Sequence, residues 1–407
     1  MSHTCPQCGE LIPDAASPCP RCARRALSFH EAETVLGLSV VGLAVLFAIT
    51  GFAVSLYHAK YESLGREWQA RGEADLKAEK ALKAVVDFRT ALVYARDSDA
   101  DQLSLARALR AANRTNEAKA YLTSLLERDP GNAEVNLELG RLAAREGNTE
   151  DALRYYHGAM YDDWGGRDPA EARRAVRLEL YQYLIKRNER PLAEAELVAM
   201  AALLPPDPVL YTQVGQLFLK LDDYSRAAHE FEGAVRFGGG QAALAAAGEA
   251  EFLLGDYRQA RSYLARALRE KPEDTRLSRM LDDADRVLNA DPYEPGLGPE
   301  ERNHRVVRAF QQAVTRLGEC GVLVTGTVQR GTAAAPTASG SAALGEEARS
   351  LQPSVNRAAL RRNPALMTTI MNFVFRVEQV PAGECGPPDP LDQALAAIAQ
   401  EHGSADR

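Results

Sequence analysis

A spacing of small and bulky apolar residues recurs along the middle of the chain. In six places an alanine is followed four residues later by a bulky side chain, and three residues after that by a further apolar one. The six alanines are Ala84, Ala118, Ala152, Ala193, Ala227 and Ala260, at steps of 34, 34, 41, 34 and 33 residues. Steps of four and three place these positions on one face of a helix. We therefore expect six copies of one helical unit.

A second position, twelve residues before each alanine, predicts another helix in every unit. It is occupied by Gly72, Ala106, Gly140, Tyr181, Gly215 and Gly248. Glycine has no side chain and lets two helices approach closely, so each unit is predicted to be a helical hairpin. The fourth copy departs from the pattern, because Tyr181 replaces glycine and about seven extra residues around 164–169 lengthen the preceding turn.

These features resemble the tetratricopeptide repeat, whose pattern of W-x2-L-G-x2-Y, A-x3-F and P has a period of 34 residues. Trp68 and Gly72 match its opening in the first copy, and Leu139 and Gly140 match it in the third. The resemblance implies an all-α solenoid of about six hairpins, which provides a binding surface instead of a catalytic cleft. With a capping helix at Thr275–Leu288, this region spans residues 65–290. An irregular all-helical domain is the alternative.

An uncharged apolar run at residues 34–57 predicts a single transmembrane helix. Its 24 residues reach about 36 Å at about 1.5 Å each, enough to cross a hydrocarbon core of about 30 Å. A cleaved signal peptide fits less well, because the run is long and a folded module precedes it. Arg21, Arg24 and Arg25 precede the run, and this basic excess favours a cytoplasmic N-terminus. We expect a bacterial inner (plasma) membrane protein with extracytoplasmic repeats.

Two CxxC pairs in residues 1–26 predict a metal site. Cys5, Cys8, Cys19 and Cys22 form pairs separated by ten residues, the usual arrangement of a closed tetrahedral zinc site. The segment resembles a short bacterial zinc ribbon, which implies a structural Zn²⁺ as its cofactor. Two disulfides or redox chemistry are the alternatives. Thiols kept free for a metal also suit the reducing side of a membrane.

The remaining residues, 291–407, are expected to form a small α/β-like extension. A Pro- and Gly-rich break is followed by a predicted helix at 300–317 and a strand-like segment, Gly321–Val328. Residues 330–346 are expected to be a flexible linker. Met367–Val380 is either a strand or the end of a helix, because its β-branched and aromatic residues favour the first and the preceding alanines the second.

Cys320 and Cys385 each lie in the tetrapeptide Gly-Glu-Cys-Gly. If the two strand-like segments paired antiparallel, the thiols would lie side by side. A disulfide there would contribute about 4 kcal/mol in the chain-entropy model and would agree with an oxidising compartment. Two unrelated buried thiols are an equal alternative.

The predicted partner is a protein or peptide. A net charge of −8 and a pI near 5.6 argue against a nucleic-acid partner. In the resembling family the first helix of each hairpin lines a concave groove. The basic residues expected to line this groove are Arg107, Arg110, Arg141, Arg145, Lys186 and Lys220. Such a ladder would suit an acidic peptide, since Arg binds carboxylates in bidentate fashion. Solvated surface charges are the alternative.

The sequence contains no phosphate-binding, zinc-protease or nucleophile-elbow motif, and its seven histidines are scattered. We therefore assign no catalytic residue and do not expect an enzyme. The predicted function is a membrane-anchored scaffold of the tetratricopeptide-repeat type that binds its partner through the concave face. Two other classes stay open: a transmembrane sensor that uses the zinc ribbon, and an envelope-assembly factor with its activity in residues 300–407.

Overall fold

The computed structural model describes residues 2–13, 18–95, 98–162, 164, 168–322 and 340–402. Within these residues the strands are β1 (His3–Thr4) and β2 (Leu11–Ile12), paired antiparallel with His3 opposite Ile12. All longer elements are helices. The chain divides into two compact units, residues 1–176 and 177–407.

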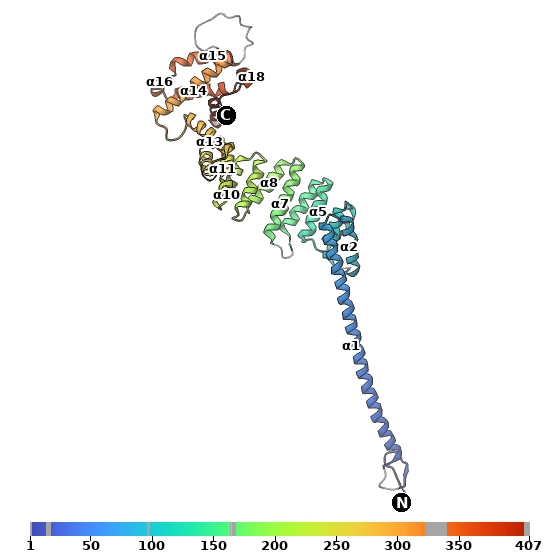
Figure 1. The fold of residues 1–407 in the computed structure, drawn as a ribbon. Helices are drawn as coiled ribbons and strands as arrows, with labels where there is room; N and C mark the ends of the chain where they lie inside the picture. Colours follow the sequence, from blue (N-terminus) through green and yellow to red (C-terminus); the bar gives the residue numbers. More distant parts are fainter. Residues whose placement is uncertain are drawn as a thin grey trace. The chain divides into compact units, whose positions relative to one another are not determined.

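In the first unit, α1 (Pro20–Lys77) is a single helix of 58 residues. Pro20 occupies its first turn, where the missing N–H removes no helical hydrogen bond. The expected membrane segment, residues 34–57, lies inside α1, and Figure 1 shows no break along it. Its apolar side chains are exposed, from 52% for Val45 to 73% for Leu38. By length and composition α1 is able to cross a membrane.

The rest of the first unit consists of paired helices. They are α2 (Ala81–Tyr94), α3 (Asp99–Ala111), α4 (Thr115–Arg128), α5 (Ala133–Glu146), α6 (Thr149–Tyr161) and the start of α7 (Pro169–Lys186). The end of α1 packs on α2, α3 on α4, and α5 on α6. A Cβ on Gly72 would lie 2.9 Å from the ring of Phe88, and one on Gly140 would lie 3.2 Å from Tyr156. The predicted close approaches are therefore present.

The second unit continues the pairing. It contains the rest of α7, α8 (Arg190–Ala201), α9 (Pro208–Leu219), α10 (Tyr224–Arg236), α11 (Gly240–Leu254), α12 (Tyr257–Glu270) and α13 (Thr275–Ala290). Gly215 and Gly248 again face Phe231 and Leu264, at 2.7 and 2.8 Å from the added Cβ. Tyr181, which replaces the glycine, is buried, and its hydroxyl donates to the Leu217 carbonyl on α9 at 3.5 Å.

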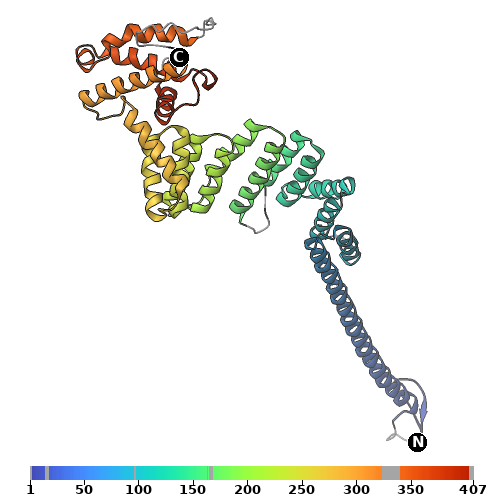
Figure 2. The same cartoon turned by 45° about the horizontal axis from the view of Figure 1, so that its top comes forward.

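A helical bundle ends the second unit. It comprises α14 (Pro299–Glu319), α15 (Gly340–Leu351), a 3₁₀ turn (Gln352–Ser354), α16 (Arg357–Arg362), α17 (Ala365–Glu378), α18 (Ala382–Cys385) and α19 (Pro390–His402). Figure 2 shows these orange to red helices gathered together. The α17 helix contacts α14, α15, α16 and α19, and α19 also packs on α13.

The expectation of an α/β-like extension is wrong for the described residues. The strand alternative for Met367–Val380 fails because α17 covers most of this segment. Neighbouring helices enclose α17, so Phe373, Val374 and Phe375 are all buried without a sheet. Tertiary packing here outweighs intrinsic β propensity. The expected linker is helical from Gly340 onward. Residues 323–339, which include most of the other strand-like segment, lie outside the described residues.

Cys320 and Cys385 are joined by a disulfide, with Cα atoms 4.0 Å apart and a sequence separation of 65. Cys320 directly follows α14, and Cys385 ends α18. Helix ends, not paired strands, bring the two residues together.

Candidate metal centre and partner-binding surfaces

The four N-terminal cysteines converge on one point. Cys5 follows β1, Cys8 lies in the turn after it, Cys19 directly precedes α1, and Cys22 lies in the first turn of α1. Gly9, with φ +77°, closes the first turn by donating its N–H to the Cys5 carbonyl at 2.9 Å. The four sulfur atoms lie within 4.8 Å of one another.

The spacing of these sulfurs fits a tetrahedral metal site. Cys5 Sγ lies 3.9 Å from Cys22 Sγ, and Cys8 Sγ lies 3.5 Å from Cys19 Sγ. A tetrahedral zinc with Zn–S bonds of about 2.3 Å holds its sulfurs about 3.8 Å apart. The cluster could therefore hold a metal ion with four protein ligands, a closed set that leaves no position for substrate.

The pKa values of two of these thiols are shifted in opposite directions. Hydrogen bonds from the backbone N–H groups of Gln7 and Cys8 lower the pKa of Cys5 to about 7. The side-chain hydrogen bond with Cys8 raises the pKa of Cys22 to about 12. Thiolates this close repel one another, which disfavours the ionised form of all four together. A bound divalent cation would stabilise all four thiolates.

In the first unit the predicted basic ladder is engaged internally. Arg107 donates to Glu134 at 2.9 Å and to Glu138 at 3.2 Å. Arg110 and Arg141 donate to Glu138 at 2.7 and 2.8 Å. Glu138 is 1% exposed, so three guanidinium groups surround one buried carboxylate. These contacts link the first helices of two successive hairpins.

The arginines therefore do not form a free basic surface, which corrects the sequence-based interpretation. Arg145 donates to the Arg110 carbonyl at 2.7 Å and to Asn113 Oδ1 at 2.9 Å. Lys186 and Lys220, in the second unit, are exposed. The sequence does contain a signal for this pairing. Glu138 follows Arg107 by 31 residues, about one repeat, so the two lie on the first helices of successive hairpins.

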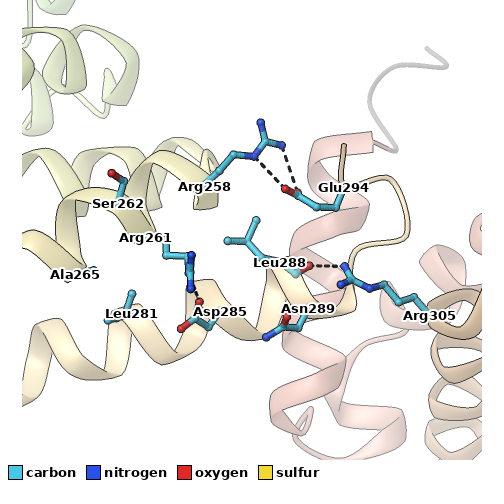
Figure 3. Close-up of a pocket in the computed structure, with 10 residues that line it drawn as sticks. All are labelled: Arg258, Arg261, Ser262, Ala265, Leu281, Asp285, Leu288, Asn289, Glu294 and Arg305. Atoms are coloured by element: carbon cyan, nitrogen blue, oxygen red, sulfur yellow. Dashed lines mark hydrogen bonds and ion pairs between the residues drawn. The ribbon is translucent and has the colours of Figure 1, made fainter. Parts of the chain in front are cut away.

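A cavity of about 710 Å³ opens between α12 and α13 (Figure 3). We call it the α12–α13 groove. Its lining is Arg258, Arg261, Ser262, Ala265, Leu281, Asp285, Leu288, Asn289, Glu294 and Arg305. Arg258 binds Glu294 through two hydrogen bonds of 3.1 and 3.3 Å, and Arg261 pairs with Asp285. Arg305 donates to the Leu288 carbonyl at 2.7 Å.

The groove lies beside α13, which packs on α12 and α19 and not on the helix that follows it in the chain. The first helices α9 and α11 are each covered by a second helix through Gly215 and Gly248. The helix after α13 is α14, which packs with the C-terminal helices instead. Leu281 lies 33 residues after Gly248, at the equivalent position, and lines the cavity. The side of α13 that a second helix would cover thus faces a groove.

Each guanidinium group of the groove is paired with a carboxylate. Arg258 pairs with Glu294, Arg261 with Asp285, and Arg305 with Glu301 at 3.0 Å. Arg258 and Arg261 are 60% and 58% exposed although both are paired. Side chains held in place yet accessible lose little conformational entropy when they bind a ligand. The groove thus combines apolar contact with accessible hydrogen-bond donors.

Two buried carboxyl groups in the second unit have raised pKa values because they are removed from water. Burial raises the pKa of Glu251 to about 7. Burial and the charge of Asp392 raise the pKa of Glu378 to about 8. Arg316 lies 3.5 Å from Glu378 and 3.3 Å from Asp392, and all three side chains are at most 2% exposed. Because these groups bind more protons when folded, stability falls as the pH rises from about 4.5 towards these values.

Replacing Glu138 with Gln should destabilise the first unit by about 2 kcal/mol, because three arginines lose a charged acceptor. Both tryptophans of the chain, Trp68 and Trp164, lie in this unit. Their fluorescence during urea unfolding therefore measures it. Glu134→Gln is the control, since it removes one partly exposed ion pair and should cost less than about 1 kcal/mol. Equal effects of the two substitutions would contradict the central position of Glu138.

The chain matches two sequence models of the tetratricopeptide repeat, at residues 109–163 and 214–275. A search of curated protein sequences found no match. Several solved structures resemble the fold. PilF of Pseudomonas aeruginosa is 18% identical, with 55% of this chain and 99% of that chain covered and a TM-score of 0.36. PilW, a type IV pilus biogenesis factor, is 18% identical, with 54% and 98% covered and a TM-score of 0.34.

YrrB, a tetratricopeptide-repeat protein with an unusual peptide-binding site, is 18% identical, with 47% and 96% covered and a TM-score of 0.32. All three TM-scores are below 0.5, so no argument about function rests on these structures. The family matches and the helical hairpins agree with one another. The chain therefore contains tetratricopeptide repeats, and its repeat region has the all-α fold of a protein-interaction scaffold.

Proposed function

We propose that this protein is a membrane-anchored scaffold that holds a protein partner through its tetratricopeptide repeats. The observation that carries the proposal is the continuity of α1. One helix contains both the apolar segment, residues 34–57, and the first helix of the first repeat. The anchor and the first repeat therefore share one continuous helix, and a partner bound to the chain would be held at the membrane.

The exposure of the apolar segment supports its place in a membrane. Leu, Val, Ile and Phe side chains project on all sides of this part of α1, and none of it is buried against the rest of the chain. Water-soluble proteins rarely expose so large an apolar surface. In a bilayer the same surface is stabilised by the acyl chains, and the helix satisfies its own backbone hydrogen bonds.

The cysteines support the direction of insertion. Four thiols spaced for a metal precede the apolar segment, and a disulfide between Cys320 and Cys385 follows it. Free thiols persist on the reducing side of a membrane, and disulfides persist on the oxidising side. Together with the basic residues that precede the apolar segment, this favours a cytoplasmic N-terminus and extracytoplasmic repeats in a bacterial inner membrane.

The metal of the N-terminal cluster is proposed to be a structural Zn²⁺ held by Cys5, Cys8, Cys19 and Cys22. A segment of about 26 residues cannot bury enough apolar surface to fold alone, so bound metal would supply its stability. Four thiolate ligands in tetrahedral spacing are the preference of zinc. The folded head would then be a second binding module, on the cytoplasmic side.

The α12–α13 groove is the proposed site for the partner. Its accessible guanidinium groups beside Leu281 and Leu288 suit an acidic segment of a protein, in extended or helical form. This keeps the acidic partner expected from the sequence but moves its site. Glu134 and Glu138 hold Arg107, Arg110 and Arg141, whose side chains are at most 30% exposed. Arg258 and Arg261 are paired but more accessible.

Purified full-length protein should contain about one zinc ion per chain. Cys22→Ser should remove most of it, because three ligands bind zinc more weakly than four. Cys320→Ser is the matched control and should retain the metal, since its sulfur belongs to the disulfide of the second unit. Elemental analysis of both variants measures this. A wild-type protein without zinc, with Cys5 and Cys22 oxidised, would refute the metal site.

The scaffold proposal is tested by reversing the charge of the groove. Proteins cross-linked in intact membranes to the full-length chain are purified with it and quantified by mass spectrometry. Arg258→Glu combined with Arg261→Glu should reduce the recovery of the groove partner at least tenfold. Arg266→Glu with Arg269→Glu makes the same charge change on exposed positions of the same helix and should leave recovery unchanged. Identical recoveries from both variants would refute the groove as the binding site.

A further inference from the structure

Three tyrosines meet where α1 leaves its apolar segment. Tyr57 is the last residue of that segment, and Tyr61 follows one helical turn later. Their ring centroids are 4.8 Å apart. Tyr94, the last residue of α2, places its ring centroid 5.1 Å from that of Tyr61. We call these three residues the tyrosine cluster. It joins the first two helices of the first repeat at one level along α1.

That level is fixed by the packing of α2 against α1. The two helices are antiparallel, because Phe88 faces Gly72 whereas the later Tyr94 faces Gly65. A Cβ on Gly65 would lie 3.4 Å from the Cβ of Tyr94, so little space separates the helices there. At about 1.5 Å per residue, Tyr61 lies about 6 Å and Gly65 about 12 Å beyond Tyr57 along the helix. The C-terminal end of α2 is therefore its end nearest the apolar segment.

The chemistry at this level suits the polar layer of a bilayer. The hydrocarbon core is about 30 Å thick and the whole bilayer about 40–45 Å, which leaves about 6 Å of headgroups on each side. This layer reaches Tyr61 but not the backbone of α2 beside Gly65, so the Tyr94 ring, 5.1 Å from the Tyr61 ring, is the part of α2 that extends towards it. Tyrosine is enriched in this layer because its ring is apolar and its hydroxyl is polar. Tyr57 is 58% exposed, and Tyr61 and Tyr94 are half-buried. Lys60 supplies a cation at the same level.

We propose that the tyrosine cluster holds the first repeat directly against the lipid headgroups, so that the end of α2 contacts phospholipid through Tyr94. The proposal rests on the membrane span of α1 proposed above. It goes beyond anchoring, because it assigns a lipid-contacting surface to the repeat region itself. Lipid is favoured over a protein partner because the level of the cluster is set by the end of the apolar segment.

The contact would hold the first repeat to the membrane at two points. One is the continuous backbone of α1. The other is the end of α2, where Tyr94 packs against Gly65 and Tyr61 of α1. A second point of contact would restrict tilting of the repeat relative to the bilayer. The surfaces of the first unit would then face the membrane at a defined angle.

The test uses the full-length protein in nanodiscs of phosphatidylcholine and phosphatidylglycerol. A photoreactive benzoylphenylalanine replaces one residue at a time, and lipid adducts are quantified by mass spectrometry after illumination. Tyr94 is the test position, and an aromatic replacement there keeps the shape of the cluster. Leu82, also on α2, is 68% exposed and about 18 Å further from the bilayer, so it is the matched control. Phe47, in the middle of the apolar segment, reports insertion.

We expect lipid adducts at positions 47 and 94, with at least tenfold more at 94 than at 82. Adducts at 47 with no excess at 94 over 82 would overturn the seating of the repeat while leaving the membrane span intact. No adduct at position 47 would instead refute the span itself. Unchanged tryptophan fluorescence of the position-94 variant would show that the first unit is folded.

Discussion

The structure depends on the unbroken backbone hydrogen-bond ladder of α1. A helix that crosses a bilayer must satisfy every N–H and C=O group within itself, and the ladder of α1 continues past the apolar segment to Lys77. The α2 helix packs on the last turns of the same helix, with Phe88 against Gly72 and Tyr94 against Gly65. The stacking of the first unit thus begins on an element whose axis would be set by the membrane.

The apolar and the polar parts of the repeats were unequally predictable. The alanine and glycine positions identified the hairpins, because two helices pack this closely only where the residue between them is small. The ladder arginines were assigned to a free surface because a sequence shows a charge and not its counterion. Glu138, buried one repeat further on, is the counterion of three of them. Ion pairs between repeats require the stacking to be known first.

The C-terminal residues show a similar limit. The β-branched and aromatic residues of α17 favour a strand by propensity, although its exposed polar residues Thr368, Asn372 and Arg376 recur every four residues, which is the spacing of one helical face. The pairing of Cys320 with Cys385 was proposed from strands, yet the ends of α14 and α18 bring the sulfurs together. The four-cysteine cluster was predictable, since two CxxC turns determine a local geometry. The α12–α13 groove was not, because it arises where α14 leaves the repeat pattern.

Hydrogen exchange at residues 58–66 of the full-length protein in nanodiscs tests the continuity of α1 most directly. This segment joins the apolar run to the helix that packs on α2. We predict that its amides exchange as slowly as those of residues 67–76, whereas the turn at residues 129–132 exchanges fast. Exchange at 58–66 as fast as in that turn would show a flexible linker and contradict the shared rigid helix.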